Sequence, residues 1–207
     1  MLQLIAKGLL KLGGWTRVSE KPSCKKAVFI AAPHTSNWDG IWALIYIVSM
    51  QLEVHFFAKR SLFWFPLGTV LRALGGIPLD RNEPRSAVRK AVDAYTENEE
   101  FYFGLAPEGT RSKRPHWKTG FYRIAEDANV PVVLGFLDYG NRRLGLGPTI
   151  DITGDRHADL AKIRDFYEGI AGRWPDKAGP IVFPGAIKKA ARRRPRSEQS
   201  GLTENGS

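Results

Sequence analysis

The sequence of 207 residues contains one cysteine, Cys24, and four histidines that lie far apart along the chain. A single cysteine excludes an internal disulfide framework, and neither residue type recurs with the spacing of a metal site, such as paired CxxC or HExxH. The sequence therefore predicts a protein without a bound metal ion that works in a reducing compartment.

Long hydrophobic runs are also missing from the sequence. The longest candidate, residues 41–50, is well below the run of about 18 apolar residues that a membrane-spanning helix needs. The N-terminus does not show a basic region followed by a long apolar block and a cleavage site, which is the pattern of a secretory signal. We therefore expect no transmembrane helix and a cytoplasmic location.

Acidic residues are fewer than basic residues. The chain has 31 lysines and arginines against 21 aspartates and glutamates, which gives a net charge of +10. This imbalance predicts an anionic partner, such as a phosphate-bearing substrate, an anionic membrane surface or nucleic acid. Nucleic acid is the least favoured of these, because basic and acidic residues are mixed outside the C-terminal segment and no recognition module is evident.

The C-terminal segment, residues 185–207, concentrates basic residues, and we expect it to be disordered. Six of them occur without an acidic residue in between: Lys188, Lys189, Arg192, Arg193, Arg194 and Arg196. A polybasic segment of this kind suits anionic lipid headgroups, with about 1 kcal/mol for each basic residue near the surface. A segment that only keeps the protein soluble is the alternative.

The remaining composition, 43% hydrophobic and 25% charged, is that of a globular domain with a full core. Hydrophobic patterns predict strands and helices in alternation between residues 16 and 184. The expected strands cover residues 27–32, 54–58, 77–81, 101–105 and 130–136. The expected helices cover residues 40–48, 67–74, 84–95, 118–129 and 155–170. This order predicts a single α/β domain with a central mixed sheet flanked by helices and functional groups in the loops after the strands.

Residues 1–15 precede this domain and have the pattern of an amphipathic helix. Leu2, Ile5, Leu9 and Leu12 recur at helical spacing, and Lys7 and Lys11 lie on the other side. Such a helix suits a membrane interface, and a helix packed on the domain itself is the alternative.

A second apolar segment, residues 59–68, has five aromatic or leucine residues between two cations and a glycine. Aromatic residues of an ordinary core explain part of this pattern. A floor for an acyl chain or an interfacial anchor is the other interpretation.

His34 and Asp39 are candidate catalytic residues because they lie five positions apart, between an expected strand and an expected helix. Asp39 near the helix start would be stabilised by free backbone amides and could accept one ring N–H of His34. The other ring nitrogen would then be free to take a proton from a hydroxyl group. The alternative is a capping aspartate beside an incidental histidine.

The loop after the expected strand 101–105 is rich in groups that bind anions or hydroxyls. Gly109 permits close backbone approach, Arg111 offers a planar fork for phosphate, and Glu108 could accept from a substrate hydroxyl or hold an arginine. A solvated polar turn is the alternative for this loop.

Four segments occur together and in order between residues 27 and about 137: His34-x4-Asp39, Gly76–Arg81, Pro107–Ser112 and Val130–Val132. Together they resemble the glycerolipid acyltransferases, whose best-known members are the lysophosphatidic acid acyltransferases. The resemblance implies transfer of a fatty acyl group from acyl-CoA or acyl carrier protein to a lysophospholipid hydroxyl, without a covalent acyl-enzyme. It also implies peripheral attachment to the inner face of the membrane, and no cofactor besides the acyl donor as co-substrate.

The resemblance also implies roles for particular residues. His34 would be the general base and Asp39 its orienting partner. The acceptor's phosphate and glycerol would be contacted by Arg81, Glu108, Gly109, Thr110 and Arg111. Lys59 is a further candidate for phosphate binding, and the segment around Pro131 would be structural.

Two features depart from the family pattern. Ala106 stands where a bulky apolar residue often precedes the Pro-Glu-Gly sequence, and the chain before the first strand is short for a two-helix membrane anchor. The second feature admits a different acceptor, such as another lysolipid, an ornithine lipid, a sugar or a polyketide hydroxyl. A non-catalytic protein that binds anionic membranes is an alternative from another functional class.

Overall fold

The computed structural model describes residues 1–79 and 84–184 of the chain. The predictions for Arg81 and for the basic C-terminal segment, residues 185–207, lie outside the described residues.

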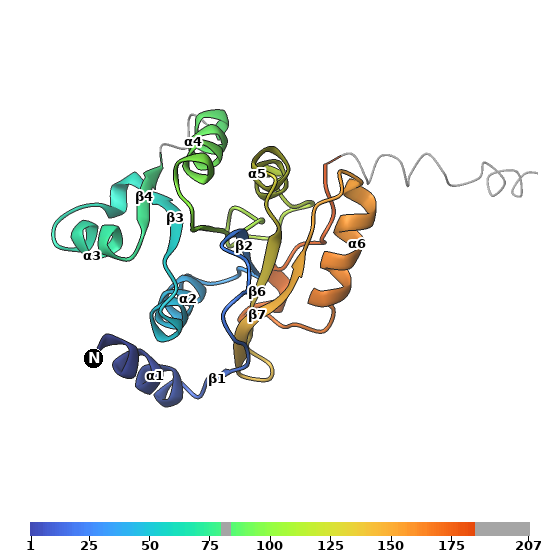
Figure 1. Ribbon diagram of the computed structural model, residues 1–207. Helices are drawn as coiled ribbons and strands as arrows, with labels where there is room; N and C mark the ends of the chain where they lie inside the picture. The colour runs from blue at the N-terminus through green and yellow to red at the C-terminus, as the bar shows by residue number, and fades with distance from the viewer. Residues whose placement is uncertain (80–83, 185–207) are drawn as a thin grey trace, which may run out of the picture.

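The described residues contain a seven-stranded mixed sheet in the order β1-β7-β6-β2-β5-β3-β4 (Figure 1). Its strands are β1 (Thr16–Arg17), β2 (Lys26–Ala32), β3 (Val54–Lys59), β4 (Gly76–Leu79), β5 (Phe101–Leu105), β6 (Val132–Asp138) and β7 (Arg143–Ile150). Strands β2 to β6 are mutually parallel, and β7 runs antiparallel to β6. The predicted α/β fold with a mixed sheet is confirmed, and β4 with its Pro78 lies at the edge of the sheet, where a missing N–H is tolerated.

Helices cover both faces of the sheet (Figure 1). They are α1 (Leu2–Leu12), α2 (Asn37–Met50), α3 (Leu67–Ala73), α4 (Pro84–Glu97), α5 (Gly120–Ala128) and α6 (Arg156–Tyr167), with 3-10 turns η1 (Arg60–Leu62) and η2 (Pro175–Lys177). Each helix predicted from periodicity is present, with ends that differ by a few residues. The short edge strand β1 was not predicted, because two residues are too few to show a pattern.

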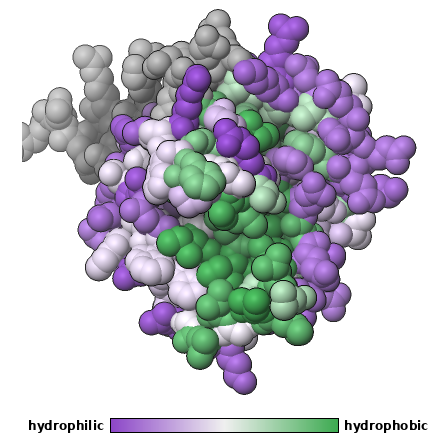
Figure 2. Space-filling view, turned by 90° about the vertical axis from the view of Figure 1, so that its left-hand side faces the viewer, coloured by the Kyte–Doolittle hydropathy of each residue, from purple (hydrophilic) through white to green (hydrophobic). Residues whose placement is uncertain are grey.

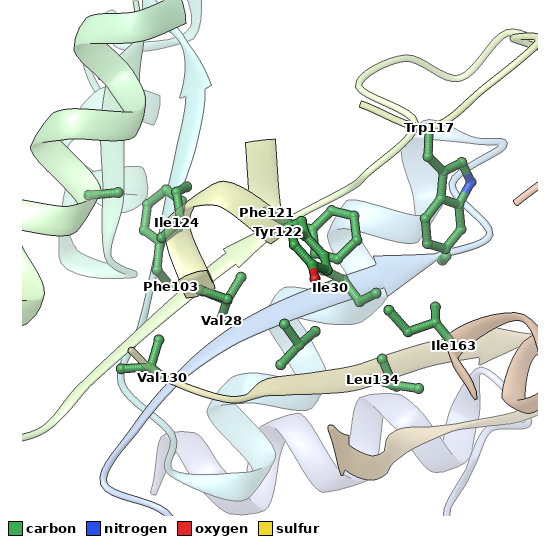
Figure 3. Packing of buried hydrophobic residues seen from close by; sticks show 14 of the residues in the cluster. Val28, Ile30, Phe103, Trp117, Phe121, Tyr122, Ile124, Val130, Leu134 and Ile163 are labelled. Carbon is green, nitrogen blue, oxygen red and sulfur yellow. The ribbon is translucent and has the colours of Figure 1, made fainter. Parts of the chain in front are cut away.

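The central strand β2 shows how the two faces are divided. Val28 and Ile30 point into the larger core, together with Phe121 of α5 and Ile163 of α6 (Figure 3). The alternate residue Phe29 packs on the opposite face in a smaller cluster. Because successive strand residues point to opposite faces, the continuous apolar run of β2 is the sign of a strand covered on both sides.

Helix α2 is only partly buried, although most of its residues are apolar. It is apolar all round, but Ile41 is 45% exposed, and several other apolar residues of the helix are only half-buried. One face of α2 lines a cavity against the sheet, and another carries α1. A cavity and a neighbouring helix both require apolar side chains, which accounts for a composition that is otherwise typical of a core helix.

Helix α1 packs on the domain and also leaves its predicted apolar stripe uncovered. Ala6 and Leu10 are its buried residues, and α1 contacts α2. The stripe itself remains exposed, up to 86% at Leu12; its residues are Leu2, Ile5, Leu9 and Leu12. Packing on the domain is therefore observed, and the apolar stripe on another face of the helix stays available for the predicted membrane interface.

The segment between β3 and α3 is likewise exposed and apolar. Phe65 is 84% exposed, Leu62 and Trp64 are also exposed, and Val70 of α3 adds a further exposed apolar side chain. Figure 2 shows a continuous hydrophobic area on the face of the molecule where α1 and α3 lie. Monomeric soluble proteins rarely expose large contiguous apolar patches unless they bind something there. None of the helices in residues 1–79 and 84–184 has the length and apolar character needed to cross a membrane.

The parallel strands bring their carboxyl ends to one edge of the sheet. Ala32 at the end of β2 is paired with Phe136 in β6, Ile30 with Leu105 at the end of β5, and Lys59 with Leu79. The loops that follow these strands therefore meet at the same edge, which is where open α/β sheets bind ligands.

Candidate active site

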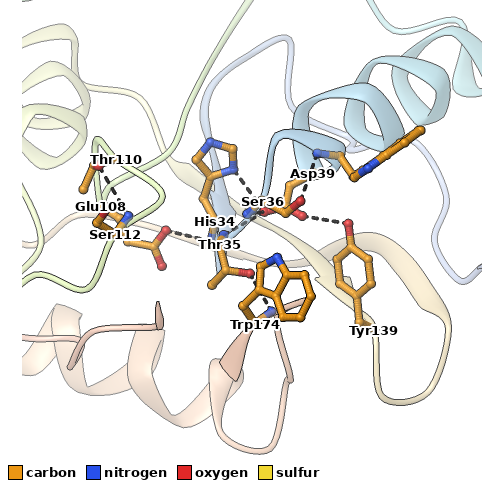
Figure 4. Close-up of polar contacts among 10 residues, drawn as sticks. His34, Thr35, Ser36, Asp39, Glu108, Thr110, Ser112, Tyr139 and Trp174 are labelled. Carbon is orange, nitrogen blue, oxygen red and sulfur yellow. Dashed lines mark hydrogen bonds and ion pairs between the residues drawn. The ribbon is translucent and has the colours of Figure 1, made fainter. Parts of the chain in front are cut away.

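His34 lies in the turn between β2 and α2, as predicted. The N-cap of α2 is Ser36, and Asp39 at position N3 completes a capping box with it. The His34 Nδ1 atom lies 3.3 Å from Asp39 Oδ2 (Figure 4). The helix start thus holds the carboxylate and the imidazole together, so the capping and orienting roles of Asp39 coexist.

Asp39 is almost completely buried and accepts hydrogen bonds on both carboxylate oxygens. The backbone N–H groups of Thr35 and Ser36 each donate to Oδ2 at 2.7 Å, and the Tyr139 hydroxyl donates to Oδ1 at 2.7 Å. Burial by itself raises the pKa of Asp39, but the hydrogen bonds from His34, Tyr139 and Ser36 outweigh it, so the pKa is lowered overall. Asp39 is therefore ionised at neutral pH.

The imidazole of His34 has one protected and one available nitrogen. An ionised carboxylate can only accept, so Nδ1 carries the proton that points to Asp39. The Nε2 atom is then left as an acceptor, and the side chain of His34 is 21% exposed. The pair can take a proton from a hydroxyl group that approaches from outside.

Glu108 has a different partner from those that the sequence suggested. Its Oε2 accepts a 2.6 Å hydrogen bond from the backbone N–H of His34, and its side chain is buried. Burial raises the pKa of Glu108 to about 7, although the bond from His34 acts in the opposite direction. Instead of holding an arginine, Glu108 connects the loop after β5 to the turn that carries His34.

The neighbouring loop residues are more accessible. Gly109 is exposed at a φ of +64°, and a Cβ at this position would come within 2.6 Å of the Lys118 side chain. Thr110 accepts a long hydrogen bond from the backbone N–H of Ser112, and Arg111 is exposed. The positive φ at position 109 therefore favours glycine there, independently of any ligand.

Lys59 lies at the carboxyl end of β3 and its side chain is exposed. Within the described part of the chain, neither Lys59 nor Arg111 has a carboxylate within ion-pair distance. Both cations follow strands that end at the same sheet edge as His34. Lys59 and Arg111 are thus available to an anionic ligand. Among the described residues, no side chain is seen to contact both of them.

Three residues of the site were missed by the sequence analysis. Tyr139 follows β6, and Trp174 donates its backbone N–H to Thr35 Oγ1 at 3.2 Å. Gly172 packs so closely on Thr35 that a Cβ there would lie 2.8 Å from Oγ1. Tyr139 carried one usable signal, because it comes directly after a parallel strand. The loop 171–174 carried none.

A cavity of about 270 Å³ opens beside His34, between α2 and the sheet. Its walls are almost entirely apolar and run from His34 and Asp39 to Ile47 and Leu52. Asp39 and Ile47 lie eight positions apart, which corresponds to about 12 Å along a helix. Gly40 and Ala43 face this cavity, and their small size leaves it open.

The described residues around the site do not form a cluster of metal ligands. In residues 1–79 and 84–184, no three His, Cys, Asp or Glu side chains lie close enough together to hold a metal ion.

The chain is similar to known proteins in both sequence and fold. The family model described as Acyltransferase matches residues 16–133, which is more than half of the chain. The fold is similar to the crystal structure of the 1-acyl-sn-glycerophosphate (LPA) acyltransferase PlsC from Thermotoga maritima, with a TM-score of 0.59. The similarity covers 84% of this chain and 79% of that chain at 20% sequence identity. No curated protein sequence matches the chain.

The matched region contains the four sequence segments His34-x4-Asp39, Gly76–Arg81, Pro107–Ser112 and Val130–Val132. It therefore includes each motif on which the resemblance to the glycerolipid acyltransferases rests. The chain belongs to the acyltransferase family.

Proposed function

We propose that this acyltransferase moves a fatty acyl group from the thioester of coenzyme A or acyl carrier protein to a hydroxyl of a lysophospholipid, such as 1-acylglycerol-3-phosphate. The observation that carries the proposal is the position of the His34–Asp39 pair at the mouth of an apolar cavity. The similar structure from Thermotoga maritima is that of an enzyme with a lysophosphatidic acid acceptor.

In the proposed reaction, the Nε2 atom of His34 takes the proton of the acceptor hydroxyl as its oxygen attacks the thioester carbonyl carbon. A new C–O bond forms and the carbonyl becomes a tetrahedral oxyanion. The intermediate collapses with cleavage of the C–S bond, and the thiolate receives the proton from His34. Asp39 stabilises the imidazolium that exists between the two proton transfers. No covalent acyl-enzyme is formed in this reaction.

The apolar cavity is proposed to hold the acyl chain of the donor. Its apolar walls from α2 and the sheet are unfavourable for water, and its volume of about 270 Å³ suits a flexible alkyl chain. Each methylene group buried there contributes about 0.8 kcal/mol to binding. The open end at His34 would leave the thioester next to the base.

The acceptor's phosphate is proposed to bind on the β3–β5 side of His34. Lys59 and Arg111 are exposed there, and each ends or follows a strand that reaches the site. Arg81 follows β4, the strand paired with β3, and is proposed to join them. Two or three cations around a phosphate dianion would position the hydroxyl relative to Nε2.

The exposed apolar area is proposed to place the protein on the inner face of an anionic membrane. α1 contributes Leu12 and Leu9, and the segment before α3 contributes Trp64 and Phe65. Apolar and aromatic side chains of this kind enter the headgroup region, and the basic residues of 185–207 would add electrostatic attraction. A lysolipid in that membrane would reach the site without passing through water.

The central experiment measures release of free thiol from acyl-CoA and from acyl carrier protein with a panel of lysolipid acceptors. His34→Ala is expected to remove turnover, and His157→Ala serves as the matched control because His157 is exposed and distant in sequence from the site motifs. If neither donor gives turnover above the His34→Ala background with any acceptor, the enzymatic proposal fails. Turnover with a sugar, polyketide or ornithine-lipid hydroxyl alone would replace the proposed acceptor.

Membrane binding is tested separately by sedimentation with vesicles that contain anionic phospholipid. Replacing Leu12 and Phe65 by serine is expected to reduce binding, whereas thiol release with a soluble short-chain acceptor persists. Deletion of residues 188–207 should weaken binding in a salt-dependent manner. A non-catalytic membrane protein would instead lose its main activity with this deletion and keep it in His34→Ala.

A further inference from the structure

A second cavity lies on another face of α2, and the proposed reaction assigns no role to it. Its volume is about 500 Å³, and its walls are Trp38, Trp42, Tyr139, Arg142, Arg173 and Trp174. Trp38 and Trp42 are four residues apart and so share one face of the helix, whereas Gly40 and Ala43 line the acyl cavity. We call this space the Trp–Arg cavity.

Two wall residues of the Trp–Arg cavity form hydrogen bonds with the turn that carries His34. Tyr139, which forms part of its wall, donates its hydroxyl to Asp39 at 2.7 Å. Trp174, another wall residue, donates its backbone N–H to Thr35 next to His34. In Figure 4 both residues lie beside His34 on the side away from Glu108 and Thr110. A ligand in this cavity would therefore approach His34 from the side opposite to Lys59 and Arg111.

The charge of the cavity is positive and is not neutralised by acidic side chains. The Arg173 guanidinium lies 5.8 Å from the ring centre of Trp38 and 5.7 Å from that of Trp174. Arg142 lies 5.9 Å from Trp15, and Lys177 lies 5.6 Å from Trp174. No carboxylate of the described residues is within ion-pair distance of these three cations.

Aromatic rings position a guanidinium without occupying its N–H donors. Stacking on the indole faces orients Arg173, which also lies within hydrogen-bonding reach of the Tyr139 hydroxyl, and the remaining donors of its planar fork can bind a phosphate group. The same indole faces, with Trp38 and Trp174 each about half exposed, can stack on a flat heteroaromatic ring. A ligand that satisfies both features carries phosphate groups together with an aromatic base.

We propose that the Trp–Arg cavity binds the nucleotide part of a coenzyme A thioester, which makes acyl-CoA the donor. This inference rests on the proposed acyl transfer and decides between the two donors that it leaves open. Coenzyme A presents an adenine ring and three phosphate groups, whereas the prosthetic arm of a carrier protein presents a single phosphodiester and no base. With the acceptor on the Lys59 and Arg111 side, the two substrates meet at His34 from opposite sides.

The test is equilibrium binding of free coenzyme A, followed by quenching of tryptophan fluorescence in the full-length chain that carries His34→Ala. Binding is thereby separated from turnover. Arg173→Ala and Arg142→Ala are each expected to weaken coenzyme A binding roughly tenfold to hundredfold, the loss typical of a hydrogen-bonded ion pair with phosphate. Arg89→Ala is the matched control, because Arg89 is exposed in α4, outside the cavity.

Competition defines which part of the ligand is recognised. Adenosine 3′,5′-bisphosphate is expected to displace coenzyme A, and pantetheine, which has neither phosphate nor base, is not. Coenzyme A affinity within twofold of the parent in both arginine variants would overturn the proposal, as would equal competition by pantetheine. Displacement by glycerol 3-phosphate but not by adenosine 3′,5′-bisphosphate would also overturn it, because the cavity would then bind the acceptor.

The outcomes of this test and of the thiol-release assay are distinguishable. Absence of coenzyme A binding together with turnover from acyl carrier protein would refute the donor site and leave the acyl transfer intact. Binding that depends on Arg173 in a protein that shows no acyl transfer would support the nucleotide site and refute the proposed function. Circular dichroism and thermal unfolding of each variant identify those that fail to fold.

Discussion

The substitution Asp39→Asn tests the catalytic pair with the least disturbance of the fold. The asparagine carbonyl can still accept from the backbone N–H groups of Thr35 and Ser36, and its NH₂ group can donate to the Tyr139 oxygen. The capping box and the turn are thus retained. The change removes the negative charge that faces His34 Nδ1 at 3.3 Å.

The magnitude follows from this distance and from the partial exposure of the pair. Two unit charges at 3.3 Å interact with about 5 kcal/mol at an effective dielectric constant of about 20, which is an upper bound. A hydrogen bond to a charged group contributes about 1.5–3 kcal/mol net of solvation. The smaller estimate corresponds to a decrease in kcat of about 10-fold to 150-fold.

The assay is steady-state thiol release with saturating acyl-CoA and acceptor. KM is expected to change little, because the proposed role of Asp39 is to stabilise the imidazolium and includes no contact with substrate. Tyr139→Phe is the companion variant, since it removes one hydrogen bond from Asp39 but keeps its charge, and a smaller decrease in kcat is expected. A kcat of Asp39→Asn equal to that of the wild type, in a protein that unfolds at the same temperature, would refute the orienting role.

Three further predictions concern stability and chain length. Because burial raises the pKa of Glu108 from 4.5 to about 7, the folded protein binds more protons than the unfolded chain in this window. Its free energy of unfolding should thus fall by up to about 3 kcal/mol as the pH rises from about 4.5 to about 7, and urea titrations should show that Glu108→Gln lacks this fall. Gly109→Ala should lower the free energy of unfolding by about 1–2 kcal/mol, measured by thermal denaturation, because φ is +64° there; an unchanged melting temperature would contradict this account. Ala43→Phe should shift acyl preference to shorter chains in a series of acyl-CoA donors, because it fills the cavity beside α2, and an unaltered chain-length profile would exclude the cavity as the acyl site.

Most elements of the fold could be predicted because their patterns are local. The apolar run of β2 and the periodicity of α5 and α6 reflect how each segment meets the core. The apolar pattern of α1 was predicted from the sequence, but the face that packs on the domain was not. The buried residues are Ala6 and Leu10, which lie outside the predicted stripe on the side where α1 contacts α2.

The candidate site divides in the same way. His34 and Asp39 could be paired from the sequence, because a capping box brings residues a few positions apart into contact whatever the rest of the fold. The contact of Glu108 with His34 spans 74 positions and that of Tyr139 with Asp39 spans 100. No local pattern encodes such contacts.

The sequence by itself determined the family motifs, the helices and five of the seven strands, and the histidine–carboxylate pair at a helix start. The tertiary structure alone decided what surrounds that pair. Strand β2 lies between β5 and β6 in the sheet, so the loops after all three strands converge on His34. That convergence places Glu108 on one side and Tyr139 on the other, and it creates the two cavities along α2. Strand order depends on long-range packing of whole elements, which no single stretch of sequence specifies.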